Sequence, residues 1–141
     1  MLPKKFEDRL AAWSQLRNRC ADMELDQALK EINTWWFQPA WMPYHLHWDE
    51  RAVWPDPWQL LEDDLFCPLA RGLGILYTIA IINHPDIESA VLTEVGGDNL
   101  VLINKKKYIL NWDRDEIVNI NLGLQNPRRS VDLEQIQQQI K

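Results

Sequence analysis

The chain has 141 residues, of which 46% are hydrophobic and 26% charged, a composition that fits one ordinary globular domain and excludes collagen-like, disulfide-rich and largely disordered classes. Its formal net charge of -6 at pH 7 has the wrong sign for a protein that coats phosphate backbones, so we expect no nucleic-acid partner. The longest apolar run, Leu73–Ile82, is too short for a bilayer, and the first residues lack a secretory signal. We therefore expect no membrane span and a cytosolic setting in which Cys20 and Cys67 are free thiols.

Two amphipathic helices are predicted at the start of the chain. Apolar residues recur every three or four positions from Phe6 to Leu16 and again from about Asp22 to Trp36, which places them on one face of each helix. Asp22 can cap the second helix. We expect the two helices to form an antiparallel pair.

Tryptophan marks the middle of the chain. Six of the eight tryptophans fall within the 24 positions from 35 to 58, and large aromatic rings suit either internal packing or a contact surface for another protein. Prolines interrupt any periodicity before Asp56, so we expect an ordered aromatic loop. Asp56 followed by Pro57 then predicts a short capped helix that ends near Asp63.

A long buried helix and a small sheet are predicted next. Cys67-Pro68 repeats the arrangement of a cap followed by proline, and the helix that it starts is apolar on most sides up to about Asn83. The short runs 90–95, 99–103 and 108–112 are rich in β-branched and aromatic residues and read as an antiparallel meander, with an exposed lysine turn between the last two.

The last predicted element is a helix capped by Ser130, with a thin apolar stripe of Leu133, Ile136 and Ile140. The expected fold class is therefore α+β, with N-terminal helices, a central Cys-capped helix packed on a small antiparallel β-meander, and a C-terminal helix. We expect a single domain over residues 1–126, with its core at 57–113, and an amphipathic helix over 127–141.

The order of elements around Cys67 resembles the core of transglutaminase-like and papain-like cysteine hydrolases. In that family the nucleophilic cysteine opens the central helix, a histidine begins a later strand, and an Asp or Asn closes the following strand. On this chain the resemblance covers about residues 57–113 and matches Cys67 to the nucleophile and Asn111 to the third member. The histidine position carries Asn99, which cannot serve as a near-neutral base. The resemblance thus implies a degenerate core without catalysis.

An enzyme remains the alternative interpretation. Cys67 at a helix N-terminus could act as the nucleophile of a cysteine hydrolase or amide transferase, with His45 or His47 as an unusual base and Asn111 as the residue that orients it. The pair His45-x-His47 also has the spacing of two metal ligands. Because aromatic residues alternate around it, we interpret the pair as packing and expect no metal and no cofactor.

A second set of stretches resembles small proteins of contractile-tailed bacteriophages. The stretches are 33–36, 43–49, 54–61, 67–78, 99–102 and 108–111. This resemblance implies a non-catalytic structural or adaptor protein of the virion, in the baseplate or tail, that joins other proteins in a multi-subunit assembly formed in the host cytoplasm. A free inhibitor of a host enzyme is a weaker alternative. The expected contact residues are Trp35, Trp36, Trp41, Trp48 and Trp54, with a second patch at Leu133, Ile136 and Ile140.

Overall fold

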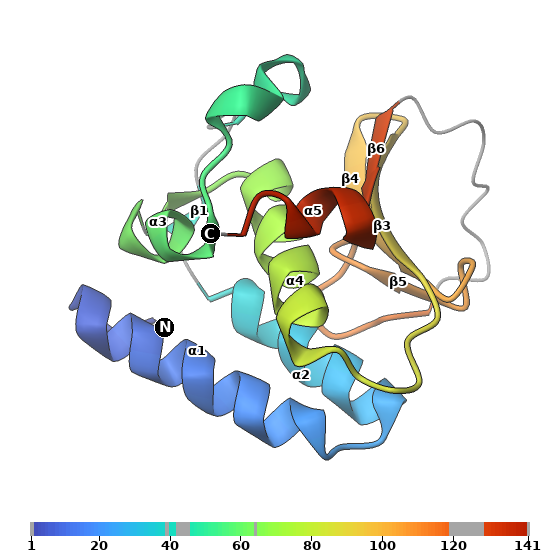
Figure 1. Cartoon of the computed structure of the whole chain (residues 1–141), viewed down its shortest axis with the longest axis horizontal. Helices are drawn as coiled ribbons and strands as arrows, with labels where there is room; N and C mark the ends of the chain where they lie inside the picture. Colours follow the sequence, from blue (N-terminus) through green and yellow to red (C-terminus); the bar gives the residue numbers. More distant parts are fainter. Residues whose placement is uncertain (1, 39, 42–45, 64, 119–128, 141) are drawn as a thin grey trace.

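The computed structural model describes residues 2–38, 40–41, 46–63, 65–118 and 129–140, and of residues 40, 41 and 65 only the backbone. The architecture is α+β, as the sequence predicts. Helices gather around one long central helix, and a four-stranded antiparallel sheet lies beside that helix (Figure 1). No helix within the described ranges is long and apolar enough to cross a membrane.

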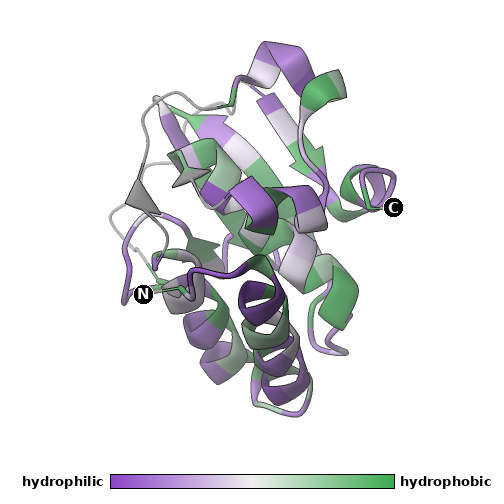
Figure 2. Cartoon of the chain, turned by 90° about the vertical axis from the view of Figure 1, so that its left-hand side faces the viewer, coloured by the Kyte–Doolittle hydropathy of each residue, from purple (hydrophilic) through white to green (hydrophobic). Residues whose placement is uncertain are grey.

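The two N-terminal helices form the expected antiparallel pair (Figure 1). Helix α1 spans Phe6–Ala21 and helix α2 spans Leu25–Trp36. The first helix runs further than predicted, so the second begins at Leu25 after Glu24 and not at Asp22. Hydrophilic and hydrophobic residues alternate along the ribbons of the outer helices, as their amphipathic patterns predict (Figure 2).

The aromatic loop is more structured than the sequence indicates. Strand β1 (Ala40–Trp41) pairs in parallel with β2 (Leu65–Phe66), and a 3-10 helix η1 covers Trp48–Val53. Helix α3 spans Pro57–Asp63 as predicted, and the Asp56 carboxylate accepts the Gln59 amide at 2.8 Å. A proline at the first helical position and a capping carboxylate before it are local signals, which is why this short helix was predictable.

Helix α4, Pro68–Ile82, is the buried centre of the molecule. Cys67 caps its start, and Asn83 ends it in a left-handed conformation with φ 52°. The helices α1, α2 and α3 contact α4, and so do strands β3 and β4 of the sheet. A Cβ atom added at Gly72 would lie 2.6 Å from Leu92 Cδ1, so glycine permits the close approach of the helix to the sheet.

The sheet has the order β5-β4-β3-β6 and is antiparallel throughout. Strands β3 (Ala90–Val95), β4 (Asp98–Ile103) and β5 (Tyr108–Leu110) form the predicted meander. The lysine turn between β4 and β5 is exposed, also as predicted. The fourth strand, β6 (Arg129–Asp132), pairs with β3 from Val91 to Glu94 and was not predicted.

The end of the chain corrects the prediction of a separate terminal helix. Ser130 lies on strand β6, and helix α5 spans only Leu133–Gln137. Its cap is Asp132, whose carboxylate accepts the Gln135 amide while the Gln135 side chain accepts the Asp132 amide. Because α5 contacts α4 and β6 completes the sheet, residues 129–140 belong to the domain itself.

Candidate functional site

The three positions that match the cysteine-hydrolase pattern meet at the N-terminal end of α4. Cys67 is the cap of α4, Asn99 lies on β4, and Asn111 follows β5. The Asn111 Nδ2 amide connects the elements, since it donates to the carbonyl oxygens of Pro68 at 2.9 Å and Asn99 at 2.7 Å.

The thiol of Cys67 is occupied by backbone groups. It is 2% exposed, and its Sγ accepts hydrogen bonds from the amides of Ala70 and Leu46, each at 3.4 Å. The Ala70 bond caps helix α4, and the Leu46 bond fastens the segment before η1 to the helix. Two amide donors would stabilise a thiolate, but in this structure the sulfur acts as a buried acceptor that joins two segments.

Asn99, which the resemblance matches to the catalytic histidine, is itself hydrogen-bonded. Its Oδ1 accepts from Trp48 Nε1 at 2.8 Å. An indole nitrogen is only a donor, so this bond fixes the orientation of the amide, with Nδ2 on the side away from Trp48. A carboxamide cannot relay a proton as imidazole does, and the Asn99 carbonyl oxygen already accepts from Asn111.

Asn111 forms hydrogen bonds to several segments around the N-terminal end of α4. Its backbone is left-handed, with φ 72°, a conformation that asparagine tolerates better than most residues. Its Oδ1 accepts from Arg71 Nε at 2.6 Å, and its own backbone amide donates to Asn33 Oδ1 at 2.9 Å. Asn33 is fully buried and also donates to the Asp113 carbonyl at 2.7 Å. Both polar atoms of the Asn111 side chain are thus used inside the fold.

The histidines do not form a dyad with Cys67 among the described residues. His45 lies outside them. His47 is exposed, and its backbone oxygen accepts from Trp54 Nε1 at 2.9 Å. His84 Nε2 lies 2.8 Å from the Met23 oxygen, while its Nδ1 accepts the Asp86 amide at 3.1 Å, so Nε2 carries the proton.

The predicted tryptophan contact surface is wrong for the four residues whose side chains the structure describes. The exposed fractions are 8% for Trp35, 1% for Trp36, 7% for Trp48 and 6% for Trp54. The side chain of Trp41 lies outside the description. The rings stack edge to face with one another, as Trp48 and Trp54 do with centroids 5.4 Å apart, so they fill the interior.

The second predicted patch is also covered by the domain. Ile136 is fully buried, and Leu133 and Ile140 are partly buried against the core. Among the tryptophan side chains that the structure describes, the most exposed is Trp58, which is 38% exposed and contacts the Trp13 ring edge to face. Sequence periodicity could not separate Trp58 from the buried rings, because burial depends on contacts between distant elements.

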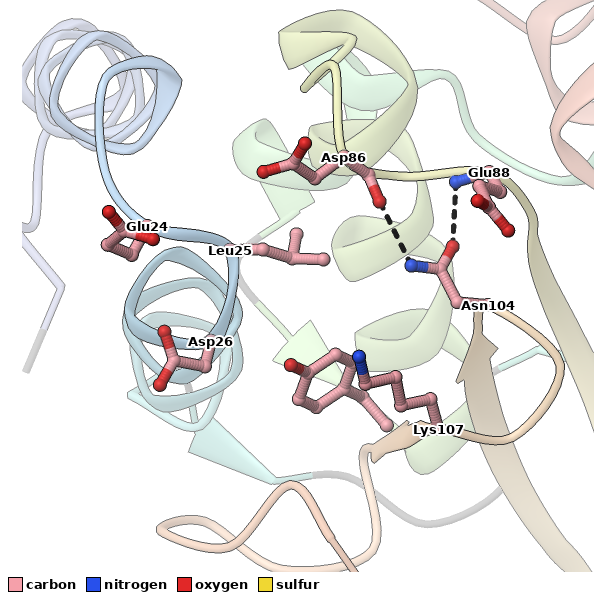
Figure 3. A pocket seen from close by; sticks show the side chains of 8 residues that line it. Glu24, Leu25, Asp26, Asp86, Glu88, Asn104 and Lys107 are labelled. Atoms are coloured by element: carbon pink, nitrogen blue, oxygen red, sulfur yellow. Dashed lines mark hydrogen bonds between the residues drawn. The ribbon is translucent and has the colours of Figure 1, made fainter.

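An acidic pocket of about 380 Å³ lies on another side of the molecule (Figure 3). The start of α2, the loop after α4 and the turn before β5 form its walls, and Asn104 fastens the loop to the turn through bonds to the Glu88 amide and the Asp86 carbonyl. Over the described residues, no three His, Cys, Asp or Glu side chains are grouped to hold a metal. We assign this pocket no function.

Arg71 is the residue of the α4 region that the sequence interpretation missed. Its side chain lies over the Phe37 ring at 3.8 Å and bonds to Asn111. Burial lowers the pKa of the Arg71 guanidinium, an effect that the neighbouring Cys67 partly opposes. The sequence did contain a signal for it: Arg71 is the single charged residue between Pro68 and Ile82. A single charged residue in an apolar helix is unusual and indicates a specific partner or role.

Comparisons of the chain with models of known families, with curated proteins and with solved structures found no match. The class that the fold defines is an α+β domain with a cysteine-capped central helix beside an antiparallel sheet. Any closer assignment depends on the residues of the site.

Proposed function

We propose that this chain is a non-catalytic structural or adaptor protein built on a degenerate cysteine-hydrolase-like core. The observation that carries the proposal is the state of Cys67, which is buried and accepts two backbone amides. A nucleophile needs an open path to the substrate and a base within reach. Here the position of the base holds Asn99, and its side-chain Oδ1 accepts a hydrogen bond from Trp48.

The proposed setting is the virion of a contractile-tailed bacteriophage, in the baseplate or tail, with assembly in the host cytoplasm. The resemblance of the quoted stretches to small phage proteins supports this setting. A rigid domain in which buried tryptophans bond internally suits a component that keeps its shape in an assembly. The contact surface would have to lie outside Trp35, Trp36, Trp48 and Trp54, because these four side chains are enclosed.

Mass spectrometry of gradient-purified particles of the encoding phage tests the setting. We expect the chain to remain with the particles after a high-salt wash, at a fixed ratio to a tail protein. A chain found only in the soluble fraction of the lysate would contradict the virion role and favour the free inhibitor. The control is a host protein of similar abundance, which the wash should remove.

Cysteine alkylation tests the non-catalytic part of the proposal. In the Cys20→Ser variant, which leaves Cys67 as the only thiol, we expect native protein to react with iodoacetamide at least about ten times more slowly than urea-unfolded protein at pH 7.5, because the sulfur is buried. In the Cys67→Ser variant the remaining thiol should stay inert at pH 9. Burial, together with the charge of Glu31 and against that of Arg19, raises the pKa of Cys20 to about 11.

The cysteine hydrolase or amide transferase is the second candidate. The two amides that point at Cys67 Sγ favour it, as do the helix N-terminus and the nearby Arg71, because all of them stabilise a thiolate. If native Cys67 is alkylated rapidly at pH 6, the thiolate is activated and the enzyme becomes the better interpretation. The same reaction in His47→Ala protein would then show whether His47 is the base.

A further inference from the structure

A second hollow of the molecule lies next to Asn111. It has a volume of about 360 Å³, within the range of small-ligand pockets, about 300–1,000 Å³. The first turn of α4, the start of β4 and the end of β5 form its walls. The polar and aromatic residues of its lining include Arg71, Asp98, Asn99, Asn111 and Trp112.

The guanidinium of Arg71 is held in place on this wall. Its Nε donates to Asn111 Oδ1, and its Cζ lies 3.8 Å from the centroid of the Phe37 ring. Among the described residues, no oxygen accepts from its two terminal nitrogens and no carboxylate forms an ion pair with it. An arginine whose side chain is held in place, half-buried and not paired with a carboxylate is suited to bind an anionic ligand.

Two further donors on the pocket wall have no acceptor in the described chain. The Trp48 bond directs Asn99 Oδ1 to the indole and leaves Asn99 Nδ2 unused. The indole nitrogen of Trp112 is buried and makes no hydrogen bond. A ligand that supplies an acceptor oxygen in the pocket would satisfy the Asn99 amide.

We propose that this pocket binds a carboxylate group, supplied by a small organic acid or by the C-terminal residue of a polypeptide. A carboxylate matches the planar fork of Arg71 with two oxygens and can accept from Asn99 as well. A phosphate fits less well, because Asp98 lines the same pocket and the chain has a net charge of -6. The inference does not depend on whether Cys67 is reactive.

Titration of ¹⁵N-labelled protein with sodium N-acetylglycinate tests the site. At constant ionic strength we expect saturable shifts of the Arg71 Nε–H and Trp112 indole signals, the latter assigned with a Trp112→Phe variant. N-acetylglycinamide, which has the same shape but no carboxylate, should leave both signals in place. Equal shifts with the amide, or shifts that never saturate, would overturn the proposal.

Variants separate Arg71 from its surroundings. Arg71→Gln should weaken binding at least about ten-fold, and Arg71→Lys should weaken it less, because lysine keeps the charge but loses the fork. Asp98→Asn, on an exposed residue, should tighten binding several-fold by removing a like charge. If Asp98→Asn has no effect and Arg71→Gln binds like the unmodified chain, the proposal is wrong.

Sodium acetate distinguishes the two sources of the carboxylate. Equal affinity for acetate and N-acetylglycinate would indicate that only the carboxylate is recognised, as for a small acid. Tighter binding of N-acetylglycinate would indicate a polypeptide C-terminus. Both results support the carboxylate site, whereas binding of neither probe would contradict it.

Discussion

Replacement of Thr78 by valine is expected to lower the free energy of unfolding by about 2–6 kcal/mol. The Thr78 hydroxyl is fully buried and accepts from the indole nitrogens of Trp13 at 2.9 Å and Trp36 at 3.0 Å, while it donates to the Gly74 carbonyl at 2.7 Å. Valine has nearly the same shape but no acceptor, so both indole donors lose their partner, at about 1–3 kcal/mol each. Urea unfolding followed by circular dichroism measures the loss.

Thr78→Ser is the matched control, because serine keeps the hydroxyl and loses one methyl group. We expect it to lower the free energy of unfolding by only about 1 kcal/mol. If Thr78→Val unfolds at the same urea concentration as Thr78→Ser, the paired indole bonds do not hold α1 and α2 to α4. In that case packing alone would account for the stability of the three-helix contact.

Replacement of Gly74 by alanine should destabilise the protein by about 2–4 kcal/mol, even though alanine favours a helix by about 1 kcal/mol over glycine. An added Cβ would lie 2.4 Å from the Cε3 and Cζ3 atoms of Trp36. The Trp36 ring is 1% exposed and contacts Trp13, Trp35 and Phe66, so it has no free space in which to move. Thermal unfolding should show a fall in Tm of roughly 5–15 °C.

A double-mutant cycle tests the cause of this loss. In a Trp36→Leu background the opposing ring is absent, so Gly74→Ala should cost less than half of what it costs in the unmodified chain. An unchanged cost in that background would mean that the helix backbone, and not the Trp36 ring, rejects the substitution.

The sequence predicted the elements whose signals are local. The pairs Asp56-Pro57 and Cys67-Pro68 predict the starts of α3 and α4. The short runs of β-branched residues between polar turns predict the meander. Strand β6 escaped prediction because four residues with one buried valine carry no periodic signal. Its partner β3 lies more than thirty residues earlier, and such a pairing can only be found in three dimensions.

The site was predictable in part for the same reason. That Asn99 cannot serve as a general base could be seen from residue type alone, because an amide is not basic near neutral pH in any surroundings. The burial of the tryptophans could not be predicted in this way. An indole ring has both an apolar body and a polar N–H group, so the same residue is suited to the interior and to a contact surface. The position of the Arg71 side chain is fixed by Phe37 and Asn111, which are far from it in the chain, so it could not be predicted from local sequence.

The pairing of β6 with β3 also determines when the sheet can be completed during synthesis. Strand β3 is central in the finished sheet, but until Arg129–Asp132 leave the ribosome it is an edge, with its amides and carbonyls open to other strands. Arg129 also carries the ion pairs to Asp49 at 2.9 Å and Glu94 at 3.7 Å, which join the η1 segment to the sheet. A chain that lacks Arg129–Asp132 would therefore expose an unpaired edge of β3, which could pair with strands of other molecules.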